Sequence, residues 1–223
     1  MPSTVVDAAR RARWMGAEEP PGNARAALHD LAEQARRLAA TLVRVDAEEC
    51  DARRLAALRA RLAEVTEAVA ELPDIGSTVT PAAAPGPAGR LLERSPVGGR
   101  ANPVSAPLSY TFDGEHTRAH AVFGEQHEGP AGHAHGGVVA AAFDELLGIA
   151  QMAAGVAGQT VALTVRYLRP TPLRTPITFE ARVDEVTGRR TRLSATCTAG
   201  ERLLARAEGT FVVQQRLGAD ADA

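Results

Sequence analysis

The chain has 223 residues, in which 25 Lys and Arg residues are nearly balanced by 27 Asp and Glu residues, for a formal net charge of -2. A near-neutral chain has no basic field to attract nucleic acid, so that class of partner is not expected. The hydrophobic share of 45% and the charged share of 23% are ordinary for a globular protein. The two cysteines, Cys50 and Cys197, are far apart. We therefore expect no disulfide framework and a reducing compartment.

The beginning of the chain does not have the pattern of a targeting segment. Residues 1–16 carry one Asp and several Arg residues and contain no long apolar run, so they do not read as a secretory signal. The most apolar window, 138–158, is interrupted by Asp144, Glu145 and Gln151, and it falls short of a clean membrane span. We expect a cytoplasmic protein without a membrane span.

Two heptad-like apolar stripes follow the N-terminal tail and predict two helices, at about 24–45 and 47–72. Between them, Asp46 followed by Glu49 resembles a capping box and is expected to start the second helix. This helical arm is either a packing appendage without chemistry or an element for dimerisation or partner binding. The sequence leaves both interpretations open.

Changes in composition divide the chain into five parts. Pro73 ends the second helix, and the stretch that follows is rich in Pro, Ala and Gly, as linkers are. The expected parts are a flexible tail at 1–23, the helical arm at 24–73, a linker and ordered loop at 74–107, a folded domain at 108–216 and a second tail at 217–223.

The C-terminal part changes its hydrophobic period. A strand-like segment at 109–125 is followed by a helix at 136–154 that is apolar on nearly all sides, as a buried helix is. Four further strands are predicted, at 159–168, 176–186, 192–198 and 203–213. Gly188 and Gly200 lie at the last two turns, where hairpins need them, so the sheet should be antiparallel. The sequence predicts an α+β fold, with a curved antiparallel sheet wrapped round one central helix.

The start and middle of this apolar helix carry the residues best suited to chemistry. Asp144 and Glu145 stand on it, and a buried carboxylate is costly unless it is paired or takes part in function. Adjacent positions on a helix point about 100° apart, so only one of the two need be buried. The helix is preceded by His135 and begins with Gly136 and Gly137. Free N–H groups at this helix terminus would suit an anion or the oxyanion of an acyl group.

The spacing of these residues has a consequence for assembly. Gly136 and Asp144 are eight positions apart, which is about 12 Å along one helix. An oxyanion donor and a nucleophile must both come within about 3 Å of the same carbonyl group, so one helix cannot supply both. Two antiparallel copies can. If this chemistry is real, the enzyme is at least a dimer with two composite sites.

Several segments together resemble a known family. The run His135-Gly-Gly-Val-Val-Ala-Ala-Ala-Phe-Asp144-Glu-Leu-Leu-Gly, the later Tyr167-Leu-Arg-Pro, Glu128-Gly-Pro and Asn102-Pro resemble the signature of hotdog-fold acyl-CoA thioesterases. The most similar subgroup is the HGG type, which is related to the phenylacetate-degradation thioesterases. The resemblance covers roughly 95–215 and leaves out the helical arm. It implies the hotdog fold.

The resemblance also implies roles for particular residues. Asp144 matches the helix carboxylate that acts as nucleophile or general base on the thioester, and Gly136 matches the glycine whose N–H polarises the thioester carbonyl. His135 is expected to shape the site, and Thr160 to position water or Asp144. The implied substrate-binding residues are Gly137, Asn102 and Arg169. The implied reaction is hydrolysis of an acyl-CoA thioester, by a homodimer or a dimer of dimers, with no cofactor and no metal.

Other interpretations stay open on the sequence alone. A hotdog dehydratase or hydratase is one, although position 130, five before His135, is Pro where the hydratase motif has Asp. A non-catalytic acyl-CoA binder or scaffold is another. Arg166, Arg169 and Arg174 could meet CoA phosphates or could simply be solvated. The pair His133 and His135 has a metal-like spacing, but no further ligand follows at a zinc-binding offset.

Overall fold

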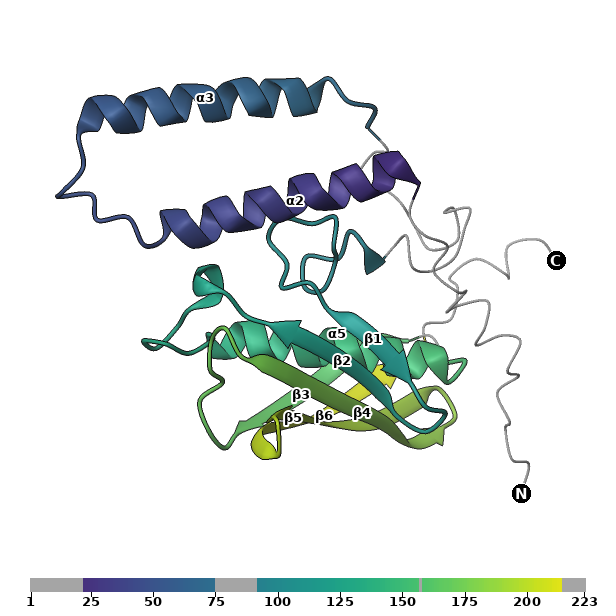
Figure 1. The fold of residues 1–223 in the computed structure, drawn as a ribbon. Coiled ribbons are helices and arrows are strands. Elements are labelled where there is room, and N and C mark those ends of the chain that lie inside the picture. Colours follow the sequence, from purple (N-terminus) through teal and green to yellow (C-terminus); the bar gives the residue numbers. More distant parts are fainter. Residues whose placement is uncertain (1–21, 75–91, 157, 214–223) are drawn as a thin grey trace.

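The computed structural model describes residues 22–74, 92–156 and 158–213. A pair of helices comes first, and a sheet with one long helix follows (Figure 1). In chain order the elements are α2 (Asn23–Leu42), α3 (Ala52–Ala70), β1 (Ser109–Phe112), β2 (Thr117–Val122), a short 3-10 helix η1 (Glu125–His127), α5 (Gly136–Ala153), β3 (Gln159–Tyr167), β4 (Pro176–Thr187), β5 (Arg190–Ala199) and β6 (Arg202–Val212). Nearly all of the first predicted tail, all of the second and half of the predicted linker and loop lie outside the described residues, so the five-part division stays a prediction.

The six strands form one antiparallel sheet in the order β1-β2-β4-β5-β6-β3. Helix α5 lies along one face of this sheet (Figure 1). Gly188 and Gly200 have φ angles of 57° and 56° at the β4–β5 and β5–β6 turns, where a residue with a side chain would be strained. The molecule has the hotdog fold, and the predicted fold class is confirmed.

The core forms between α5 and the inner face of the sheet. Alternate residues of β4 and β5 are buried, as expected when one face of a strand covers a helix. From α5, Phe143 and Leu147 are fully buried, and the Phe143 ring meets the Phe179 ring edge-on with their centroids 5.1 Å apart. Gly209 of β6 allows the close approach of the helix, because a Cβ atom there would lie 2.8 Å from the Leu147 side chain.

The segment before α5 differs from the prediction of a single strand over 109–125. It forms a hairpin, in which β1 and β2 pair with each other and β2 also pairs with β4. Asp113 and Gly114 make the turn: Gly114 has a φ of 101°, and the Asp113 carboxylate accepts from the His116 N–H at 2.9 Å. Asp-Gly is a strong turn signal, and it stood inside the segment that was interpreted as continuous.

The helical arm has the two predicted helices, but the second begins later than predicted. Asp51 is the N-cap of α3, and its side chain accepts from the Arg53 N–H at 3.0 Å. The predicted cap, Asp46, instead accepts from the Glu48 N–H within the preceding turn. The capping box at Asp46 was therefore wrong, because that carboxylate closes a local turn before the helix starts.

Helix α2 is the part of the arm that docks on the rest of the molecule. It lies over residues 92–108, which precede β1, and over η1 (Figure 1). The buried Arg36 donates to the carbonyls of Arg100 at 3.1 Å and Asn102 at 2.8 Å, and Glu93 pairs with both Arg25 and His29. These contacts fix α2, whereas α3 has no buried residue.

One helix of the described residues, α5, is long and apolar enough to cross a membrane by length and composition alone. The same properties are those of a helix that packs against a sheet, which is where α5 lies.

Candidate active site

The N-terminus of α5 has a histidine cap that leaves one backbone donor free. The Nδ1 atom of His135 accepts from the Gly137 N–H at 3.0 Å, which satisfies that donor. For the Gly136 N–H, no acceptor is found among the described residues. The helix dipole places partial positive charge at this end. A single N–H therefore remains available for an oxygen atom with developing negative charge.

The phenol of Tyr167 holds the peptide that follows this donor. It stands at the end of β3 and donates to the Gly136 carbonyl at 2.7 Å. A Cβ atom at Gly136 would lie 3.4 Å from the ring of Tyr167. The end of β3 therefore orients the start of α5. Tyr167 belongs to the Tyr-Leu-Arg-Pro motif, and its place in that motif was the only signal in the sequence for a role in orienting the start of α5.

Asp144 and Thr160, predicted to act together, are brought into contact. The Thr160 hydroxyl, on the exposed strand β3, donates to Oδ1 of the half-buried Asp144 at 2.9 Å. The pairing of β3 with β6 shifts its register between Thr160 and Ala162, which marks a bulge beside this contact. Bulges redirect side chains and are common next to active sites. One carboxylate oxygen is thus oriented, and the other is not engaged by a hydrogen bond from the described residues.

The next carboxylate on the helix, Glu145, lies in a different environment. Burial raises its pKa, the charge of Asp144 adds to this, and the hydroxyls of Ser95 and Tyr110 oppose it in part. Burial also raises the pKa of Tyr110, and the charge of Glu145 contributes to that shift. Within the described residues, Oε1 of Glu145 and the Tyr110 hydroxyl have no hydrogen-bond partner of good geometry. The two neighbouring acids of α5 therefore differ: Asp144 reaches the exposed edge strand, and Glu145 faces a buried hydroxyl pair.

A small apolar cavity lies beside the N-terminus of α5. Its volume is about 250 Å³, and its lining includes His135, Gly137, Val138, Ala141, Ala142, Pro96, Val97, Val104, Ala106, Leu108, Phe123 and His127. His127 is the one buried histidine in this lining, and burial lowers its pKa, although the nearby Val104 backbone opposes this in part. Its Nδ1 atom accepts from the Gly124 N–H at 3.2 Å. The neutral ring therefore carries its proton on Nε2, which has no partner of good geometry in the described part of the chain.

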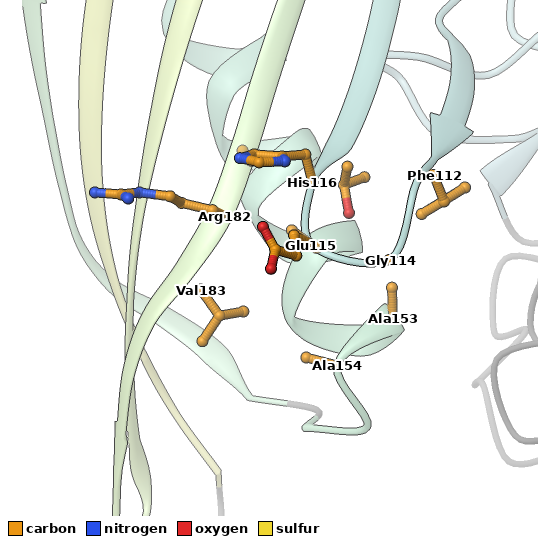
Figure 2. Close-up of a pocket in the computed structure, with 11 residues that line it drawn as sticks. Phe112, Gly114, Glu115, His116, Ala153, Ala154, Arg182 and Val183 are labelled. Atoms are coloured by element: carbon orange, nitrogen blue, oxygen red, sulfur yellow. The ribbon is translucent and has the colours of Figure 1, made fainter. Parts of the chain in front are cut away.

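A larger cavity, of about 600 Å³, lies at the opposite end of α5 (Figure 2). Ala153 of α5, the Ala154 that follows it and Val183 of β4 give it apolar walls, and Glu115 and Arg182 add charge to its lining. Neither Asp144 nor the residues of the helix N-terminus line this cavity. We do not assign it to the site.

The structure does not bring every predicted substrate-binding residue to this site. The amide of Asn102 donates to the Arg94 carbonyl and accepts from the Val104 N–H, so its polar atoms organise the loop. Arg169 donates to the Leu203 carbonyl at 2.8 Å. Gly137 does lie at the helix N-terminus, beside the small cavity. Substrate contacts by Asn102 and Arg169 stay predictions.

The remaining charged residues that the sequence analysis considered have ordinary surroundings. Arg174 pairs with Glu125 at 3.3 Å, and Arg166 is exposed on β3. In the segments 22–74, 92–156 and 158–213, no group of three or more His, Cys, Asp or Glu side chains is placed to hold a metal ion.

Comparison with known proteins gives one family and a set of similar folds. Residues 131–206 match the model of the thioesterase superfamily. The crystal structure of the thioesterase superfamily protein RHA08564 superposes with a TM-score of 0.72 at 28% identity, over 87% of this chain and 93% of that chain. A thioesterase superfamily protein from Shewanella loihica PV-4 is 29% identical, with a TM-score of 0.43, over 48% of this chain and 91% of that chain. The predicted resemblance to the thioesterase superfamily is confirmed.

The family model matches residues inside the expected extent of the resemblance, whereas the first of the structural comparisons reaches beyond it. Residues 92–223 are less than two thirds of the chain, whereas the match to RHA08564 covers 87% of it. The match must therefore extend into the N-terminal part, which the sequence analysis had left out of the resemblance.

Proposed function

We propose that the chain hydrolyses acyl-CoA thioesters to a free acid and CoA, as a cytoplasmic enzyme without a cofactor. The match of residues 131–206 to the thioesterase superfamily supports this class of reaction. The observation that carries the proposal is the 2.9 Å hydrogen bond from Thr160 to Asp144, which orients a carboxylate on the central helix toward an exposed strand. A carboxylate in that position can attack or deprotonate.

Each proposed site is shared by two copies of the chain. Asp144 and Gly136 stand on the same helix, about 12 Å apart along its axis, so they cannot meet at one carbonyl carbon within one chain. Strand β3 is an edge of the sheet and pairs only with β6 among the described strands. Its outer edge carries unpaired backbone groups and the exposed Val161, and edges of this kind are usually covered. Pairing of two β3 edges about a two-fold axis would run two α5 helices antiparallel.

The proposed reaction follows from these groups. The thioester carbonyl oxygen accepts from the Gly136 N–H of one copy, and Asp144 of the other copy faces the carbonyl carbon. Asp144 either attacks the carbon and forms a mixed anhydride as CoA leaves as its thiolate, or it takes a proton from a water molecule that attacks instead. In the first route, water then cleaves the anhydride and restores the carboxylate. Thr160 holds the carboxylate in position in both routes.

The small cavity beside the helix N-terminus is the proposed site of the acyl group. It is mostly apolar, adjoins His135 and Gly137, and has a volume of about 250 Å³, which is below the usual range for small-molecule pockets. We therefore expect short or single-ring acyl groups to be preferred over long chains.

A panel of acyl-CoA substrates, with a thiol reagent to detect free CoA, tests the activity. We expect CoA release by the native chain and a fall of about 10³-fold or more for Asp144→Asn, because the variant can neither attack nor deprotonate. Glu145→Gln is the matched control, since it removes the neighbouring carboxylate of the same helix and should keep most of the activity. Binding without release in the native chain would point to a scaffold, and loss of the enoyl absorbance without release of CoA would point to a hydratase.

Single-turnover hydrolysis in ¹⁸O-labelled water separates the two routes. If Asp144 attacks and water then adds to the Asp144 carboxyl carbon of the anhydride, the first product molecule carries an unlabelled oxygen from the carboxylate and the label appears in the protein, an outcome that the base route cannot give. If Asp144 acts as a base on water, the label appears in the product at the first turnover.

A further inference from the structure

The surface of α3 is unusual for a helix in a folded chain. None of its 19 residues is buried, and its apolar stripe is exposed along its whole length. The stripe consists of Leu55, Leu58, Leu62, Val65 and Val69, and Leu72 continues it just beyond the helix, with exposed fractions of 36–54%. Single helices of this length are marginal in water unless a face is packed. Such a stripe is therefore a surface for another helix.

Helix α2 of the same chain does not cover this stripe. Its buried residues, His29, Ala32 and Arg36, belong to the face that docks on the loop before β1, and its own Leu31 and Leu38 are exposed. Figure 1 shows α3 on the far side of α2 from the sheet. Both stripes of the arm are therefore open among the residues that the structure describes.

The spacing between the apolar residues of the stripe is the same from the N-terminal end as from the C-terminal end. Its steps are three, four, three, four and three residues, which is the a and d pattern of a coiled coil. When a second copy of the helix is aligned with the first in the opposite direction, Leu55 lies opposite Leu72, Leu58 opposite Val69, and Leu62 opposite Val65. Each apolar residue thus meets an apolar residue when two α3 helices run antiparallel about a two-fold axis.

The charges of α3 favour the same arrangement. The first half carries Arg53, Arg54, Arg59 and Arg61, and the second half carries Glu64 and Glu67, with Glu71 just beyond. This order opposes the dipole of the helix itself, which favours acids in the first turn and bases in the last. An antiparallel copy runs the basic half of each helix along the acidic half of the other, and beside the seam it sets Arg59 and Arg61 opposite the uncharged Thr66 and Ala68. A parallel copy would instead bring Arg54 of one helix beside Arg59 of the other.

We propose that α3 is an interaction surface for a second copy of this chain and pairs antiparallel with the α3 of that copy. The exposed Leu stripes of the two α2 helices would flank the pair in a four-helix arrangement. This inference does not depend on the proposed enzymatic activity, and it concerns a contact separate from the β3 edge.

Cysteine cross-linking in the full-length chain tests the pairing by position. Two preparations carry Leu58→Cys and Val69→Cys, each with Cys50→Ser; the other cysteine, Cys197, is fully buried. Their masses are made different by a tag on one of them. After mixing and mild oxidation, we expect a cross-link between the two different variants and little between identical ones. Far-UV circular dichroism of each variant checks that it is folded.

The matched control uses Ala60→Cys with Glu67→Cys. These two positions lie at matching levels of the antiparallel pair, but on the face of α3 opposite the apolar stripe. This pair should not cross-link. A link between two Leu58→Cys chains would show a parallel arrangement and overturn the proposal. Equal linking of the control, or no link at any position, would also overturn it, since α3 would then face solvent or a different partner.

Discussion

Helices α5 and α3 have nearly the same length, 18 and 19 residues, but they differ in what covers them. Eight residues of α5 are buried, among them Phe143, Leu146 and Leu147, because the sheet of the same chain curves over it. None of α3 is buried, although its stripe has the more regular apolar spacing. The comparison shows that regular spacing identifies a packing face without telling which chain supplies the partner.

The first way to test this comparison is a pair of matched truncations. Leu146→Ala in α5 removes a fully buried side chain, and we expect it to lower the free energy of unfolding by about 2–5 kcal/mol. Leu62→Ala in α3 removes a side chain that is 46% exposed, and in dilute solution we expect the free energy of unfolding to fall by under about 0.5 kcal/mol. Urea unfolding followed by circular dichroism measures both. Equal losses would mean that α3 is packed within its own chain.

A second test separates α2, the docked helix of the arm, from α3. Arg36→Met removes the donors to the Arg100 and Asn102 carbonyls, and we expect the opening free energy of α2 to fall by about 1.5–3 kcal/mol. Arg37→Met is the control, because the exposed Arg37 side chain pairs with Glu33 at 3.4 Å and makes no other hydrogen bond within the described residues. Hydrogen exchange of the α2 amides reports the difference. If both variants exchange alike, the buried guanidinium does not hold the arm.

The smallest expected effect concerns the pH dependence of the core. Burial raises the pKa of Glu145, so ionisation of this carboxyl lowers the stability of the folded chain. The loss begins as the pH rises above 4.5, the ordinary glutamate value, and is complete above the raised pKa. Gln cannot ionise, so Glu145→Gln should flatten the fall of the melting temperature with rising pH. Melting curves recorded from about pH 4.5 upward measure this. An identical slope in both proteins would show that Glu145 stays solvated.

Much of the sheet and helix core could be predicted because its signals are local. The apolar run of α5 and the glycines at 188 and 200 act within a few residues, and they mark the helix and two hairpins. The two errors, the unsplit strand and the cap at Asp46, were also local. In each case one carboxylate, that of Asp113 or Asp46, closes a turn inside a segment that was given a different interpretation.

The site was only partly open to prediction. The resemblance implied that Thr160 would meet Asp144, and the structure has that hydrogen bond. The contact of Tyr167 with Gly136 and the burial of Glu145 against Tyr110 depend on how separate elements pack, and no spacing in the sequence encodes that.

The central claim is that Asp144 and the Gly136 N–H of one site come from different chains. Gly136→Pro removes this N–H, and the change suits the first position of a helix, where the preceding His135 already has extended φ and ψ of -62° and 136°. We expect Gly136→Pro and Asp144→Asn to be inactive alone. After the two are mixed and allowed to exchange subunits, the mixture should recover about a quarter of the native rate, because half of the dimers then contain one intact site of two. No recovery in mixtures shown to contain mixed dimers would contradict the shared site.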